Sequence, residues 1–146
     1  MPGLIAPASA RTLDTPPSTG IPSAWSTEVP DHVEALAISP DARRIAVAAV
    51  SGSIALLDSA TGAAIATLPG HALGTTCLGW SPDGRLLASG GQDRRVRIWN
   101  GLDGTPVRDL DAGGGWATGV AWSDDGRLLA SAADRELRVW NRDGDM

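Results

Sequence analysis

The chain has 146 residues, enough for one ordinary domain, and a formal net charge of −5. All 12 basic residues are arginine, and because they form no basic patch we expect no nucleic-acid partner. A lone cysteine, Cys77, excludes an intramolecular disulfide. No apolar run approaches the ~18 residues that a membrane span needs, so we expect no membrane partner.

The chain begins with a stretch unlike the rest. Residues 1–20 are rich in proline, alanine, serine and threonine and carry few apolar side chains. Such a stretch cannot bury enough surface to offset the entropy lost on ordering it. We expect a disordered leader or linker, and the tail of an upstream domain boundary is an equally open interpretation. From residue 21 the pattern changes to short apolar runs separated by turn residues, which is typical of β-strands.

One phrase recurs with a period of 42 residues. The two strong copies read SPDGRLLASGGQDRRVRIWN from Ser81 and SDDGRLLASAADRELRVWN from Ser123, and a worn copy precedes them by one period. Apolar residues keep this register, with Ile38, Trp80 and Trp122 directly before the opening serine of each copy. A fixed period of this size indicates a repeat architecture.

Each full copy contains the signals for four strands. An Asp-Gly turn precedes an apolar run at 86–88, and a second turn precedes strict alternation over 95–99. A further turn leads to a fourth short run at 106–110, and the last copy has no such run. Because no 3.6-residue period persists anywhere, the sequence predicts an all-β protein.

The pattern resembles the WD40 repeat family, in which each repeat forms one blade of a β-propeller. The resemblance rests on Gly70-His71 before the first strand, an aspartate in the second turn and a tryptophan in the third strand, and it covers about residues 29–144. It implies a partial WD40-like propeller of about three four-stranded antiparallel blades. These blades are residues 21–70, which are degenerate, residues 71–112, and residues 113–146, which are incomplete.

The resemblance also implies a buried hydrogen-bond network inside a blade, formed by a histidine, a serine or threonine, an aspartate and a tryptophan. In the middle copy these residues are His71, Ser89, Asp93 and Trp99. The third copy keeps Ser131, Asp134 and Trp140, although Gly113 stands in place of the histidine. The first copy retains essentially none of the network, so we expect apolar packing alone to hold it.

His71, Ser89 and Asp93 are also the residue types of a nucleophilic triad. However, Ser89 lies inside an apolar run and not on the strained elbow that exposes a catalytic serine. The third copy repeats the serine and aspartate without a histidine, which a catalytic site would need as its base. We therefore predict that the chain is not an enzyme and has no catalytic residues. No cluster has metal-ligand spacing, so we expect no metal and no cofactor.

The resemblance implies a protein–protein interaction scaffold that binds a protein or peptide partner through the loops at one face. The candidate partner-binding residues in these loops are Leu73, Thr75, Gln92, Trp116 and Ala133. Trp116 follows three glycines and matches no core position of the middle copy, and exposed tryptophan is enriched at binding hot spots. The alternative is an indole folded back over the channel without a partner.

Three copies do not close a ring, because propellers have about four to eight blades. Three outcomes are open: the chain is a fragment of a longer propeller; two or more chains assemble into a ring, each donating residues 21–29; or an open arc exists alone. The alternative function is a fragment or accessory propeller segment of a larger bacterial enzyme or signalling protein. The lack of Lys, Phe and Tyr beside abundant Ala, Gly and Arg suggests a bacterial source. We expect a cytoplasmic protein.

Overall fold

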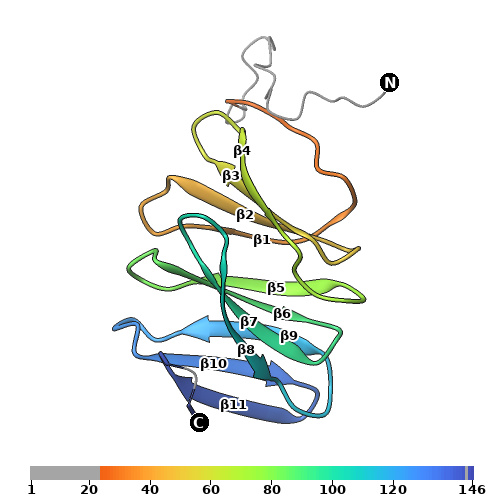
Figure 1. The fold of residues 1–146 in the computed structure, drawn as a ribbon, viewed down its shortest axis with the longest axis vertical. Coiled ribbons are helices and arrows are strands. Elements are labelled where there is room, and N and C mark those ends of the chain that lie inside the picture. Colours follow the sequence, from red (N-terminus) through yellow and green to blue (C-terminus); the bar gives the residue numbers. More distant parts are fainter. Residues whose placement is uncertain (1–23, 144) are drawn as a thin grey trace, which may run out of the picture.

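The structure, a computed structural model, describes residues 24–143, 145 and 146 (Figure 1). These residues form strands and turns without a helix, so the predicted all-β fold is confirmed. The leader predicted at residues 1–20 lies outside the described residues. The strands are β1 (Val33–Ile38), β2 (Arg44–Ala49), β3 (Ile54–Asp58), β4 (Ala64–Leu68), β5 (Thr75–Trp80), β6 (Leu86–Gly91), β7 (Arg95–Asn100), β8 (Pro106–Asp111), β9 (Ala117–Trp122), β10 (Leu128–Ala133) and β11 (Glu136–Asn141).

The strands form three antiparallel sheets, which follow one another along the stack in chain order (Figure 1). The first sheet has the order β1-β2-β3-β4 and the second β5-β6-β7-β8, while the third has only β9, β10 and β11. Neighbouring sheets meet mainly through their first strands, because β1 contacts β5 and β5 contacts β9. Each sheet therefore corresponds to one copy of the sequence repeat.

The repeated Ser-x-Asp-Gly-Arg phrase, with Ala42 in place of the glycine in the first copy, forms the turn between the first two strands of each sheet. In the middle copy the Ser81 hydroxyl donates to Asp83 Oδ1 (2.7 Å) and accepts from the Leu86 amide (3.0 Å). The Arg85 amide donates to the same carboxylate oxygen (3.0 Å). Gly84 adopts a φ of 70°, which glycine takes without steric cost. These local bonds explain why the phrase recurs.

The hydrophobic core lies between the sheets. Ile54 and Leu56 of the first sheet pack with Leu87 and Trp99 of the second, and all four are buried. The next interface repeats this arrangement, with Val96 and Ile98 of the second sheet against Leu129 and Trp140 of the third. Burial of each large aliphatic side chain contributes about 1.5–3 kcal/mol. Each interface therefore stabilises both of the sheets that form it.

Two tryptophans also connect the backbones of neighbouring sheets. Trp80 Nε1 donates to the Ala37 carbonyl and Trp122 Nε1 donates to the Gly79 carbonyl, both at 3.1 Å. Both bonds join residues 43 positions apart, so they are successive copies of one contact. The repeat pattern marked these positions only as hydrophobic. The structure shows that the indole N–H has a role that Ile38, at this position in the first copy, lacks.

The segment before β1, which one of the three outcomes has donated to a neighbouring chain, forms no strand in its described residues. Its described part, residues 24–29, has a single β-bridge residue, Ser26. The Trp25 indole donates to the Ser59 carbonyl (2.9 Å), which places this segment against the first sheet of its own chain. Among the described residues, no helix is long and apolar enough to cross a membrane.

Candidate functional site

The buried polar network of the middle sheet joins a loop, two strands and a turn. His71 precedes β5, Ser89 lies in β6, Asp93 lies in the turn after β6, and Trp99 lies in β7. His71 Nδ1 lies 2.8 Å from Asp93 Oδ1, and His71 Nε2 lies 2.7 Å from Ser89 Oγ. Trp99 Nε1 donates to the same hydroxyl (2.8 Å). The four side chains therefore form one continuous chain of hydrogen bonds.

The donors fix the direction of this chain. The Asp93 carboxylate can only accept, so His71 Nδ1 carries a proton and donates it to Asp93. In a neutral imidazole Nε2 is then an acceptor, so the Ser89 hydroxyl donates its hydrogen to Nε2 while its oxygen accepts the indole N–H of Trp99. Burial lowers the pKa of His71 from its usual 6.5, although the Asp93 carboxylate opposes this shift. The histidine is therefore neutral at pH 7.

The spacing of Asp93, His71 and Ser89 is also that of a catalytic triad, but the serine is not placed for attack. Ser89 has no exposed surface, and its hydroxyl oxygen already accepts the indole N–H of Trp99. A nucleophilic serine needs an oxygen that a substrate can reach. The arrangement can hold the loop, the turn and two strands together, because a fully satisfied buried network rigidifies the elements it joins.

Gly91 and Arg97 complete the surroundings of His71. A Cβ atom at Gly91 would overlap the imidazole ring, so the ring needs a glycine at this point of β6. Arg97 donates to the Gly70 carbonyl and lies 3.3 Å from Asp93 Oδ2. The guanidinium therefore binds both the backbone before His71 and the carboxylate that His71 contacts.

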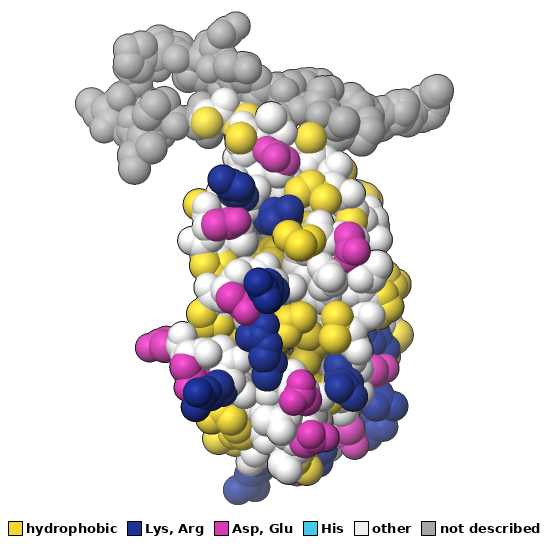
Figure 2. All heavy atoms as spheres, turned by 60° about the vertical axis from the view of Figure 1, so that its left-hand side comes forward, with side chains coloured by type: hydrophobic (Ala, Val, Ile, Leu, Met, Phe, Trp, Pro, Cys, Tyr) yellow, Lys and Arg dark blue, Asp and Glu magenta, His cyan; other side chains and the backbone are white. Residues whose placement is uncertain are grey.

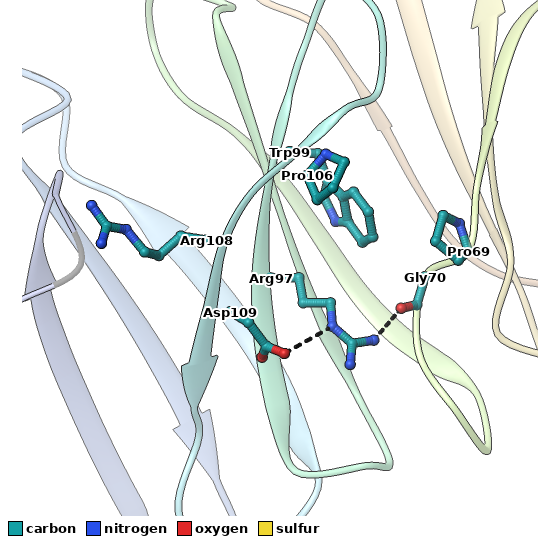
Figure 3. A pocket seen from close by; sticks show the side chains of 7 residues that line it. All are labelled: Pro69, Gly70, Arg97, Trp99, Pro106, Arg108 and Asp109. Carbon is teal, nitrogen blue, oxygen red and sulfur yellow. Dashed lines mark hydrogen bonds and ion pairs between the residues drawn. The ribbon is translucent and has the colours of Figure 1, made fainter.

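A groove of about 400 Å³ opens beside this network (Figure 3). Figure 3 shows the Arg97 guanidinium between Asp109 and the Gly70 carbonyl, with Nε 3.6 Å from Asp109 Oδ2. The groove is lined by Pro69, Gly70, Arg97, Trp99, Pro106, Arg108 and Asp109. Because Arg97 is engaged within the chain, we assign its charge to the network and not to a ligand.

The third sheet does not repeat the network, and this corrects the prediction for Ser131, Asp134 and Trp140. Ser131 Oγ is buried without a hydrogen-bond partner among the described residues, so the Trp140 indole does not donate to it. A one-residue deletion shortens the turn, and Asp134 takes a left-handed φ of 52° there. Its side chain makes no hydrogen bond within the described part of the chain.

In the third sheet an exposed residue, Glu136, binds the loop at which the missing histidine would lie. Its carboxylate accepts from the Gly114 amide (2.9 Å) and lies 3.3 Å from Arg138 Nη2. The Gly114 hydrogen bond and then the Arg138 charge lower the pKa of Glu136. A Cβ at Gly113 would overlap this carboxylate, so the glycine that replaces the histidine makes room for it. The alternating pattern of the sequence predicts Glu136 only as a strand residue. The one sign of another polar residue here was the absence of a histidine at position 113.

The structure divides the predicted partner-binding residues into two groups. Leu73 and Trp116 are exposed, with 75% and 55% of their surface accessible, and Gln92 is half-buried. Thr75 and Ala133 are buried, which makes their prediction as contact residues wrong. The Thr75 hydroxyl donates to the Gly52 carbonyl of the preceding sheet. Ala133 pairs with Ala117 in the ladder, the position that Gly91 has in the second sheet.

The loops that carry these exposed residues, before β5, after β6 and before β9, lie on one edge of the stack, at the right in Figure 1. This loop surface also includes a residue that sequence reasoning missed, because Val50, in the turn after β2, is 41% exposed. The turns meet at Gly74: its carbonyl accepts from the Gln92 amide (3.0 Å), and a Cβ there would lie 3.0 Å from the Val50 carbonyl oxygen. We define the loop surface as Val50, Leu73, Gln92 and Trp116.

The other edge of the stack has a different character. Figure 2 brings forward the left-hand side of Figure 1 and shows arginine interspersed with aspartate and glutamate along the blades. One pair joins two sheets, since Arg142 Nη2 lies 2.7 Å from Asp83 Oδ2. Partial burial opposes the shift, but hydrogen bonds from Ser81, the Arg85 amide and Arg142 lower the pKa of Asp83 to about 2. This edge therefore alternates in charge and presents no basic patch among the described residues.

Metal-ligating side chains do not gather anywhere in the described residues, where no group of three or more His, Cys, Asp or Glu could hold an ion. Cys77 is half-buried between the second and third sheets, with Sγ 3.5 Å from the Ala117 carbonyl oxygen. Burial raises the pKa of this thiol. It is therefore a protonated packing group at neutral pH.

Repeated four-stranded sheets that pack face to face, with a His-Ser-Trp network inside one of them, define a protein built from β-propeller blades. A family model described as "WD domain, G-beta repeat" matches residues 62–100 and 104–141. A second model, "Anaphase-promoting complex subunit 4 WD40 domain", matches residues 23–80. The chain belongs to the WD40 repeat family.

Solved structures show the same fold. The structure of U3-55K is 26% identical with a TM-score of 0.75, over 78% of this chain and 37% of that one. The RRP9 WD40 repeats are 26% identical with a TM-score of 0.75, over 78% and 36%. The computationally designed Ika4 protein, at 24% identity and a TM-score of 0.72, shares the fold over 82% and 71%. The chain thus spans little more than a third of the first two proteins. No curated protein sequence matches it significantly.

Proposed function

We propose that the chain is a non-catalytic protein-interaction scaffold that binds a protein or peptide partner at the loop surface. WD40 repeats generally act as protein-interaction scaffolds. The location of the binding site within this chain is our own inference. It rests on the residues of the loop surface, above all on Leu73.

Leu73 is the observation that carries this proposal. Its backbone has a φ of 70°, a left-handed conformation that costs a non-glycine residue about 1–2 kcal/mol. Three quarters of its surface is exposed, so burial against the described residues offsets little of this cost. Backbone strain of this kind is concentrated at binding sites. A strained and exposed leucine is best explained by a partner that covers it.

Trp116 supports the same location from the neighbouring blade. It ends the loop that leads into β9, in the position that Gly74 has before β5. Its indole is more than half exposed, and a large aromatic side chain supplies much contact area for little lost conformational entropy. Two apolar anchors on adjacent loops fit a short peptide or an exposed loop of another protein.

Selection of a phage-displayed random peptide library on the purified chain tests this function. We expect selected peptides to bind the Leu73→Gly and Trp116→Ala variants at least tenfold more weakly than the original chain. Leu102→Ala is the matched control, because Leu102 is also exposed but lies in the turn after β7, at the opposite edge. Equal binding to all four proteins, or the absence of any selected peptide, would refute the loop surface as the site.

The remaining sequence-based expectations concern the setting of the protein. Bacterial origin, cytoplasmic location and the absence of a nucleic-acid partner stay predictions. So does the alternative function, in which the blades are an accessory segment of a larger bacterial enzyme or signalling protein. A peptide that binds the loop surface would support the scaffold function in either setting.

A further inference from the structure

We propose that His71 is a pH-sensitive switch of the loop surface, in which protonation of the imidazole releases the loop of residues 72–74 that carries Leu73. Two residues of the loop surface are joined directly to the buried network, because Leu73 follows His71 by two positions and Gln92 precedes Asp93. A change in the network therefore reaches the loops that present these side chains. This inference concerns regulation of the same site, so its consequence for binding rests on the proposed function.

The loop that carries Leu73 is attached on both sides of this residue. On one side the His71 side chain is fully buried in the network. On the other side the Gly74 carbonyl accepts from the Gln92 amide (3.0 Å). The left-handed φ of 70° at Leu73 lies between these two attachments, and a strained backbone persists only where its surroundings hold it. Loss of the His71 attachment should therefore let the loop relax.

The hydrogen bonds of the network fit only a neutral imidazole. The Ser89 hydroxyl donates to His71 Nε2 while its oxygen accepts the indole N–H of Trp99. A protonated imidazole donates from both nitrogens, so Nε2–H would point at an oxygen that already accepts one N–H. The hydrogen of Ser89 would then have no acceptor within the network, and an unpaired buried donor is unfavourable. Protonation therefore breaks the bond between the histidine and β6.

The charged groups around the ring come from two elements of the second sheet. Asp93, in the turn after β6, lies 2.8 Å from Nδ1 and favours the imidazolium. Arg97 of β7 opposes it, and this guanidinium lies 3.3 Å from the other oxygen of the same carboxylate. The first sheet meets this residue through backbone, because the Gly52 carbonyl accepts the His71 amide (3.2 Å). Burial has the largest effect and lowers the pKa of His71, so the ring is protonated only below its usual 6.5.

A protonated ring can reach water only if the loop moves. The His71 side chain has no exposed surface, and Gly91 of β6 packs so closely on the ring that a Cβ there would overlap it. The imidazolium is favoured in water over an apolar interior. We therefore expect protonation to move the backbone of residues 71–74 away from β6 and to break the bond between Gly74 and Gln92.

An NMR titration of the isotopically labelled chain from pH 7.5 to pH 5.0 tests this switch without a partner. We expect the amide signals of Leu73, Gly74 and Gln92 to change with the midpoint at which the His71 ring titrates. Protection of the Gln92 amide from hydrogen exchange, corrected for the intrinsic effect of pH, should fall at least tenfold across that midpoint. The Leu102 amide, in the turn after β7 at the opposite edge, should not follow it.

The chain has two histidines, so His32→Gln is the matched control. His32 is exposed, precedes β1 and lies 3.3 Å from Asp31, so its replacement should leave the response of the loop intact. His71→Gln removes the titrating ring and should abolish that response.

Loop amides that stay unchanged while His71 titrates would overturn the proposal. So would a response that His71→Gln retains or that His32→Gln removes, or a loop that opens only when circular dichroism shows that the sheets unfold. The original chain and His32→Gln decide the matter even if His71→Gln does not fold. Peptides selected at pH 7.5 should bind at least threefold more weakly at pH 5.5. A failure to select any peptide would refute the loop surface as a binding site and leave the NMR result standing, so the two failures are distinguishable.

Discussion

Ser89 and Ser131 occupy the same position in consecutive sheets, but within the described residues only the Ser89 hydroxyl has hydrogen-bond partners. It receives the indole N–H of Trp99 and binds His71 Nε2, whereas Ser131 Oγ is buried and has no partner in that part of the chain. Gly113 stands where a histidine would meet Ser131. Two repeats of nearly identical sequence therefore differ in whether a buried hydroxyl stabilises the sheet.

This difference predicts that replacing serine by alanine has different effects on stability at the two positions. Ser89→Ala should lower the free energy of unfolding by about 2–4 kcal/mol, because it leaves two buried polar groups, on Trp99 and His71, without a partner. Ser131→Ala should be neutral or slightly stabilising, because it removes a buried group that has no partner. Urea denaturation of both variants measures the contrast. Equal losses would show that the network contributes little.

The neutral His71 predicts a pH dependence of stability. Its pKa is lowered in the folded protein, so between the folded value and 6.5 the unfolded chain binds more protons. Stability should therefore be complete above pH 6.5 and fall as pH decreases through the lowered folded-state pKa. Urea midpoints at pH 7.5 and 5.5 measure this loss. His71→Gln, which does not titrate, should show a smaller change over the same range, and an unchanged slope would contradict the prediction.

The indole contacts between sheets predict a modest cost for a conservative change. Trp122→Phe keeps an aromatic ring but removes the N–H that binds the Gly79 carbonyl. We expect a loss of about 1 kcal/mol in the free energy of unfolding, the usual net value of one hydrogen bond. Trp80→Phe, which removes the equivalent bond to Ala37, should cost a similar amount. A loss near zero for both would show that ring packing alone joins the sheets.

Gly91 predicts a steric effect that depends on position. Gly91→Ala would drive a methyl group into the His71 ring, and overpacking of this kind costs about 1–3 kcal/mol. Gly119→Ala is the matched control, because a Cβ there meets only the Ala132 methyl carbon at an ordinary 3.9 Å. Thermal denaturation should separate the two variants clearly. Similar melting temperatures would mean that the imidazole shifts at little cost.

Leu73 predicts a substitution that separates stability from binding. Leu73→Gly relieves a left-handed backbone but adds freedom to the unfolded chain, so the free energy of unfolding should stay equal or rise by about 1 kcal/mol at most. Urea denaturation measures the effect. A loss above about 1 kcal/mol would show that the leucine side chain supports the fold, and its exposure would then need another explanation.

The repeat period together with the strand and turn patterns was sufficient to predict an all-β repeat, because each strand of a blade depends on local turn chemistry, and the propeller arrangement came from the family resemblance. The Ser-x-Asp-Gly-Arg phrase closes its turn with bonds no more than five residues apart, as between Ser81 and Leu86. The residues of the middle-sheet network were identified through family resemblance, and the structure brings all four together. The residues of this network are far apart in the sequence, but each has a fixed position within the repeat, so aligning the repeat with the family identifies all of them.

The errors came from contacts that the repeat does not encode. Thr75 is buried because its hydroxyl binds the Gly52 carbonyl in another sheet, a partner no local pattern reveals. Asp134 was misplaced because one deleted residue changed the turn around it. Val50 was missed because its exposure depends on how the turns of two sheets meet at Gly74. Aligning the repeats predicts that residues at the same repeat position have the same environment. Thr75, Asp134 and Val50 do not follow this rule.

The indole contacts between sheets have a direction, and this bears on how the chain folds during synthesis. In both pairs the donor belongs to the later sheet and the carbonyl to the earlier one. During synthesis, the Ala37 carbonyl of the first sheet can accept this hydrogen bond only after Trp80, 43 residues further along, has been made. We therefore expect the contact between two neighbouring blades to form only after the later blade has been synthesised, because the indole that binds the earlier backbone is absent until then.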